Sequence, residues 1–172
     1  MIEISRFWRS RFLRAAPVRL GTSLAASLIL VGTPASAEDA MVKQRLDAIG
    51  YDFNVDKDGD YKIVIKYSDQ KRSQVLWVSG KTEDFGGFTI REVYSPAAKI
   101  KQDHFDGDRA LSALAAGSKK KLGDWEIRGD ALYFVVKVPE PISAAQLKTV
   151  ISVVAATADD MEIEISGSRD EL

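Results

Sequence analysis

The acidic segment Asp56-Lys57-Asp58-Gly59-Asp60 contains closely spaced carboxylates, the groups that bind calcium in proteins. An EF-hand loop needs glycine at position six and a bidentate glutamate at position twelve. Counted from Asp56, these positions hold Tyr61 and Tyr67, and both flanks alternate apolar and polar residues as strands do. We therefore interpret the segment as the turn of a β-hairpin instead of a calcium loop.

The only histidine, His104, lies among acids in the segment Asp103-His104-Phe105-Asp106, with Asp108 close behind. Imidazole and carboxylate groups together can bind zinc, and a histidine can serve as the base of a Ser-His-Asp triad. The segment precedes a predicted helix, for which Asp108 is a suitable N-cap. We expect a solvated loop here, with no metal ion.

Several other kinds of chemistry are excluded by the composition of the 172 residues. The chain has no cysteine, which excludes disulfides, thiolate catalysis, iron–sulfur clusters and cysteine zinc sites. The sequence has no nucleophile elbow, no phosphate-binding glycine loop and no dinucleotide fingerprint. Acidic residues are numerous, but no spacing singles out a catalytic pair. We expect no enzymatic activity and no cofactor.

Aromatic side chains on predicted strands form a further candidate site. Trp77, Tyr94 and Trp125, together with Phe88 and Tyr133, could line a groove. Strand aromatics usually pack in the core, since they bury large areas on a pleated surface. We keep Trp77, Tyr94 and Trp125 as a possible binding surface.

The N-terminal 37 residues have the pattern of a secretory signal peptide. Residues 1–19 carry five arginines and one glutamate, residues 20–31 are uncharged and largely apolar, and Ala35-Ser36-Ala37 is a small-x-small cleavage pattern. The apolar run of 12 residues is shorter than the roughly 20 that span a membrane. We expect cleavage after Ala37, a periplasmic or secreted product, and no stable membrane anchor.

The mature chain would start at residue 38 and carry a net negative charge. The leader holds five of the 24 basic and one of the 25 acidic residues, so 19 basic and 24 acidic residues remain, a formal net charge of −5. This charge does not favour a nucleic-acid partner. We predict one domain over residues 38–167 and a frayed acidic tail over residues 168–172.

The remaining patterns predict an α+β domain. Ser143 and Gln146 form a capping box before the last helix, and Gly50 is suited to end the first one. Leu111 and Leu114 are the apolar pair of the middle helix. The order is helix, four strands, helix, two strands, helix, which indicates an antiparallel sheet with helices on one face. The predicted helices cover residues 40–49, 108–116 and 143–165, and the strands residues 51–55, 61–67, 74–78, 88–94, 125–127 and 131–138.

Several stretches together resemble the bacterial YbjN-like family, a group labelled sensory transduction regulators. The stretches are Val75-Leu76-Trp77, residues 90–97, residues 121–125, residues 147–151 and residues 158–162. The resemblance covers most of residues 40–167 and implies a fold similar to type III secretion chaperones, small α+β domains that often dimerise. It implies no enzymatic activity and no catalytic residues.

These observations predict an exported, non-catalytic, protein-binding or chaperone-like module of the bacterial envelope. Such a module would act through a surface patch, as a homodimer or by pairing an exposed strand edge with an unknown protein partner. The alternative is a periplasmic small-molecule sensor or carrier domain with an aromatic-lined pocket near Trp77 and Trp125.

Overall fold

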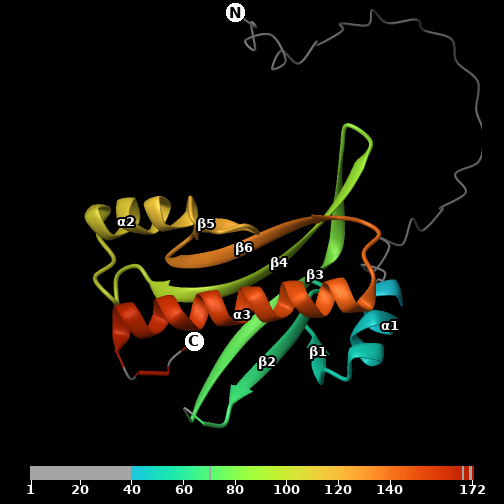
Figure 1. Cartoon of the computed structure of the whole chain (residues 1–172), viewed down its shortest axis with the longest axis horizontal. Coiled ribbons are helices and arrows are strands. Elements are labelled where there is room, and N and C mark those ends of the chain that lie inside the picture. Colours follow the sequence, from blue (N-terminus) through green and yellow to red (C-terminus); the bar gives the residue numbers. More distant parts are fainter. Residues whose placement is uncertain (1–39, 70, 168, 171) are drawn as a thin grey trace, which may run out of the picture. The chain divides into compact units, whose positions relative to one another are not determined.

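The computed structural model describes residues 40–69, 71–167, 169–170 and 172, so the predicted signal peptide lies outside the described residues. It contains three helices and six strands (Figure 1). The helices are α1 (Ala40–Ile49), α2 (Gly107–Gly117) and α3 (Ala144–Ser166), and the strands are β1 (Phe53–Val55), β2 (Tyr61–Tyr67), β3 (Arg72–Phe85), β4 (Phe88–Lys99), β5 (Asp124–Arg128) and β6 (Ala131–Pro139). None of these helices is both long and apolar enough to cross a membrane.

The six strands form one antiparallel sheet in the order β1-β2-β3-β4-β6-β5. The predicted α+β class and the predicted order of elements are both confirmed. Strand β6 pairs with β4 on one side and with β5 on the other, which accounts for the nearly continuous apolar run of residues 132–136.

Strands β3 and β4 are longer than the alternation of apolar residues predicts. Residues 82–85 pair only with residues 88–91, and together they form a hairpin that extends past β2 (Figure 1). Residues 81–88 are all exposed. Because both faces of this hairpin contact solvent, its sequence has no one-sided apolar pattern that would have revealed it.

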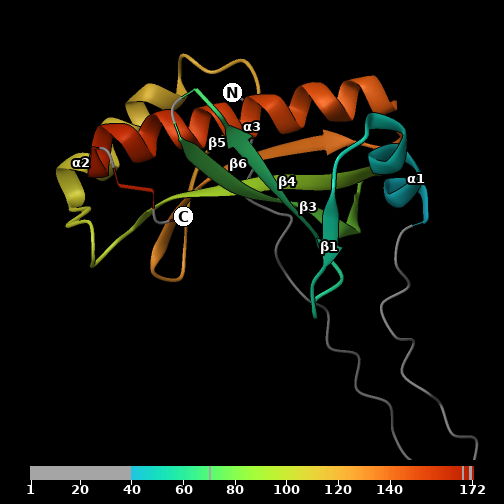
Figure 2. The ribbon, with the colours of Figure 1, turned by 90° about the horizontal axis from the view of Figure 1, so that it is seen from below.

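Helix α3 forms the core with one face of the sheet, where it contacts β3, β4 and β6. The apolar stripe from Leu147 through Ile151 and Val154 to Ala158 is buried. The capping box of Ser143 and Gln146 is present. Helix α1 packs against α3, and Figure 2 shows the helices on one side of the sheet.

Helix α2 differs from its prediction in two respects. Its N-cap is Asp106, which accepts a hydrogen bond from the Arg109 backbone, and Asp108 lies in the first turn. Its apolar pair is exposed, Leu111 by 66% and Leu114 by 61%. The helix instead packs closely against β5 through a small residue, Gly117. Only glycine fits at this position, because a Cβ atom there would lie 1.9 Å from Oδ1 of Asp124.

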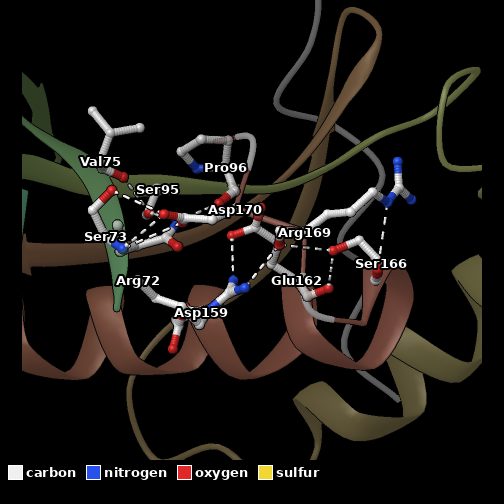
Figure 3. A network of polar contacts seen from close by, with 11 residues as sticks. Arg72, Ser73, Val75, Ser95, Pro96, Asp159, Glu162, Ser166, Arg169 and Asp170 are labelled. Carbon is white, nitrogen blue, oxygen red and sulfur yellow. Dashed lines mark hydrogen bonds and ion pairs between the residues drawn. The ribbon is translucent and has the colours of Figure 1, made fainter. Parts of the chain in front are cut away.

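A buried ionic cluster joins α3 to the start of β3 (Figure 3). Arg72 donates from Nε to Asp159 and from Nη2 to Glu162, both at 2.9 Å. Its Nη1 donates to the carbonyl of Arg169, and the Ser73 backbone donates to Asp170. Burial alone would lower the pKa of Arg72, but its carboxylate partners raise it instead. Arg169 and Asp170 of the predicted acidic tail thus make hydrogen bonds with the start of β3.

Candidate binding surface

The sheet face opposite the helices contains the strongest candidate for a functional site. Along β3, Gln74, Leu76 and Val78 are buried beneath the helices. Because successive side chains of a strand point to opposite faces of the sheet, Trp77 points to the other face. None of the described helices packs on that face (Figure 2). The register places Trp77 opposite Tyr94 of β4.

Three half-buried aromatic rings run across β3, β4 and β6 on this face. Trp77 and Tyr94 stack with ring centroids 5.7 Å apart and an interplanar angle of 9°. Tyr94 and Tyr133 meet edge to face at 6.0 Å. We call Trp77, Tyr94 and Tyr133 the aromatic row. Such contacts fix the ring orientations, so the row presents a rigid surface.

Two cations lie over the aromatic row. The Lys62 ammonium is 5.7 Å from the centroid of Trp77, and the Arg128 guanidinium is 5.3 Å from that of Tyr94. Arg128 also forms ion pairs with Glu92 at 2.9 Å and Glu126 at 2.7 Å. Burial alone would lower the pKa of Arg128, but its two carboxylate partners raise it. These contacts hold Arg128 over the ring.

The acidic segment 56–60 is the expected turn, since it joins the antiparallel strands β1 and β2. Asp56 Oδ1 accepts hydrogen bonds from the backbones of Asp58 and Asp60. Asp60 then accepts a 2.6 Å hydrogen bond from the Tyr94 hydroxyl and one of 3.0 Å from the Gly80 backbone. Burial raises the pKa of Tyr94, and the bond to Asp60 raises it further. The turn therefore positions the central ring of the aromatic row.

Glycine at position 80 allows this turn to approach β3. A Cβ at Gly80 would lie 2.0 Å from the carbonyl oxygen of Gly59, and backbone cannot move aside as a flexible side chain can. The close approach brings Asp60 within reach of both Gly80 and Tyr94.

Of the three residues predicted as a binding surface, Trp77 and Tyr94 lie together and Trp125 does not. Trp125 pairs with Phe134, whose side chain is in the core, and the two rings meet at 5.0 Å. Trp125 therefore packs on the helix side of the sheet, opposite the aromatic row. The sequence could have indicated this, because in the β5–β6 hairpin Trp125 and Ile127 pair with the apolar residues Phe134 and Leu132.

Tyr133 and Phe88 complete the aromatic candidates. Tyr133 belongs to the row, although it was not among the three residues predicted as a binding surface. Phe88 lies at the tip of the β3–β4 hairpin, where it is 62% exposed, and pairs in register with Phe85.

The acidic side chains around His104 stabilise the backbone conformation of their own loop. Asp103 accepts a hydrogen bond from the Lys99 backbone and forms an ion pair with Arg169 at 3.2 Å. Asp106 caps α2. The residues that the structure describes contain no group of three or more His, Asp or Glu side chains arranged to hold a metal ion.

A shallow groove continues the surface beyond the aromatic row. It has a volume of about 390 Å³ and lies over β1 and β2, and Lys62 connects it to Trp77. Val64 contributes an apolar side chain that is 48% exposed. The lining residues are Asp52, Asn54, Lys62, Val64 and Lys66. The row and the groove together offer ring faces, an aliphatic patch and charges on one face of the sheet.

No protein-family model matches the chain, and no curated protein matches its sequence. The geometry is therefore the basis for assigning a function. The aromatic row suits recognition by contact, because Trp, Tyr and Arg are the residues that contribute most to binding at protein interfaces.

Proposed function

We propose that this protein is a non-catalytic protein-binding module of the bacterial envelope, and that it holds its partner polypeptide on the sheet face that carries the aromatic row. The observation that supports this is the row itself: three ordered rings on a sheet face that no described helix covers. The signal-peptide pattern supports the envelope location, and the resemblance to YbjN-like proteins supports a chaperone-like role by analogy.

The form of the surface favours a polypeptide over a small molecule. Small ligands bind in concave sites that enclose most of their surface. The aromatic row instead extends over three strands and continues into a shallow groove. Trp77 and Trp125 lie on opposite faces of the sheet, so they do not line one pocket.

Site-specific photo-crosslinking in intact cells tests the proposal. A photoreactive residue at Val64 would lie beside the aromatic row, and one at Ile163, exposed on α3, provides a control on the helix side. We expect a crosslinked protein from position 64 only, and we expect its yield to fall about tenfold with Trp77→Ala and to be retained with Trp77→Phe. Equal crosslinking from both positions, or crosslinking that Trp77→Ala leaves unchanged, would contradict the proposal.

A further inference from the structure

A pocket on the helix side of the sheet combines two arginines with a single carboxylate. It has a volume of about 360 Å³ and lies where α1 meets the base of the β3–β4 hairpin and the loop that follows β6. Arg91 places it on the helix side, because this residue shares a face of β4 with the core residue Val93. The lining residues are Met41, Arg45, Thr82, Thr89, Arg91, Glu140 and Pro141. We call this site the arginine pocket, and it shares no residue with the aromatic row.

The two arginines of the arginine pocket share Glu140. Arg45 donates from Nη1 to both carboxylate oxygens of Glu140, at 3.0 and 2.9 Å, and Arg91 donates from Nε to Oε1. The Ile142 backbone donates to Oε2. Glu140 thus accepts four hydrogen bonds, about as many as a carboxylate has lone pairs. Its oxygens are therefore fully used within the chain.

The lining of the arginine pocket carries one more positive charge than negative charge. Arg45 and Arg91 are the cations among the lining residues, and Glu140 is the one acid. The side chains of Arg45 and Arg91 are only 12% and 3% exposed, so solvent screens the excess charge weakly. Asp84 accepts a hydrogen bond from Thr89, but it is exposed and does not line the pocket. The pocket therefore attracts a second anion.

We propose that the arginine pocket binds the carboxylate of a polypeptide C-terminus whose last side chain is apolar. A planar guanidinium can donate two parallel N–H groups to one carboxylate. Arg45 is the principal ligand, because within the part of the chain that the structure describes it donates only from Nη1, which leaves Nε and Nη2 for the incoming group. Thr82 adds a hydroxyl at the rim.

The other groups in the arginine pocket favour a peptide end over other small anions. Met41, which is 56% exposed, and Pro141 form an apolar wall that suits an aliphatic side chain beside the carboxylate. A phosphate ion would gain nothing from this wall. The ammonium of a free amino acid would meet two cations and the fully used oxygens of Glu140, whereas the amide nitrogen of a peptide carries no charge.

Methionine methyl NMR tests the site, because the two methionines of the described residues lie in different pockets. Met41 lines the arginine pocket, and Met161 lines a pocket beside α2 whose charged lining residues are Arg109 and Glu164. N-acetyl-leucine mimics an apolar C-terminal residue, and N-acetyl-leucinamide is its uncharged analogue. We expect N-acetyl-leucine at millimolar concentrations to shift the Met41 signal saturably and to leave Met161 unchanged, and we expect the amide to shift neither. Met41→Leu identifies the signal.

A pair of variants on α1 tests the role of the guanidinium. Arg45→Gln should weaken the binding of N-acetyl-leucine about tenfold or more, since it removes a charged hydrogen-bond donor. Lys43→Gln, a matched loss of an exposed cation on the same helix, should leave binding unchanged. Circular dichroism establishes that each variant is folded.

Three results would overturn the proposal. The first is an equal shift of the Met41 signal by N-acetyl-leucine and by its amide, which the native protein alone decides even where Arg45→Gln does not fold. The second is binding that Arg45→Gln leaves unchanged or that Lys43→Gln weakens as much. The third is tighter binding of inorganic phosphate than of N-acetyl-leucine, which would mean that the apolar wall contributes nothing.

Discussion

The hydroxyl of Tyr94 donates a 2.6 Å hydrogen bond to the carboxylate of Asp60, which joins the β1–β2 turn to the centre of the aromatic row. The two residues are 34 positions apart, and the close approach of Gly80 to Gly59 allows them to meet. The bond fixes one end of the Tyr94 ring, and Trp77 and Arg128 lie over its faces.

Asp60→Asn should lower the pKa of Tyr94, because burial and the Asp60 carboxylate both raise it in the native protein. A raised pKa means that the folded state binds the phenolic proton more tightly than the unfolded state does. Tyr94 therefore makes its full contribution to the free energy of unfolding below its unfolded pKa of about 10. This contribution is lost as the pH rises further. Tyrosinate absorbance during a pH titration measures the shift, with Tyr94→Phe to identify the signal. An unchanged titration would show that Asp60 has no influence on the ring.

Tyr67 provides a second alkaline prediction. Burial and the carboxylates of Asp159 and Asp160 raise its pKa to about 12. Its contribution to the free energy of unfolding should be complete below pH 10 and lost as the pH rises towards 12. Tyr67→Phe should therefore lose less stability than the native protein between these values, as measured by denaturant unfolding at each pH. Parallel curves for the two proteins would contradict this expectation.

The two tryptophans should differ in their effect on stability, since Trp125 packs in the core and Trp77 lies on the open face. Trp125→Ala should cost about 3 kcal/mol of unfolding free energy, in the range for large core residues. Trp77→Ala should cost about 1 kcal/mol, since it removes one stacked pair. Urea unfolding of both variants checks the difference. Equal losses would mean that the two rings are buried alike.

Arg72→Met should destabilise the fold by about 3–5 kcal/mol, because it leaves Asp159 and Glu162 buried without their cation. The triple variant Arg72→Met/Asp159→Leu/Glu162→Met removes the charges together and should be less destabilised than the single variant. Denaturant midpoints at neutral pH give the order. If the triple variant were the less stable of the two, the loss in Arg72→Met would not come from the carboxylates left without their cation.

The effect of Glu140→Gln on the free energy of unfolding should depend on pH. Burial alone would raise the pKa of Glu140, but hydrogen bonds from Arg91 and the Ile142 backbone, with the charge of Arg45, lower it. Its contribution is therefore present above the unfolded pKa of about 4.3 and is lost as the pH falls through the lower folded value. We expect a loss of about 3 kcal/mol at pH 7 that shrinks in acid, as thermal unfolding at several pH values would show. A loss that does not vary with pH would indicate a steric cause.

The placement of individual side chains followed from the sequence only where local geometry decides it. The capping box at Ser143 depends on residues three positions apart, and the turn at Asp56 on residues four apart. The burial of Asp159 and Glu162 on α3 was not predicted, since charged side chains outside the apolar stripe of a helix usually face solvent. Their partner Arg72 lies more than 80 residues away along the chain, so no local pattern reveals the ionic cluster.

The order of helices and strands was thus determined by the sequence alone, because apolar periodicity, turn residues and caps act within a few neighbouring residues. The tertiary structure decided that Trp77 and Tyr94 share a face with Tyr133, that Trp125 lies on the other face, and that the leucines of α2 are exposed. These features depend on strand register and on the approach of one backbone to another, which bring together residues that are distant along the chain.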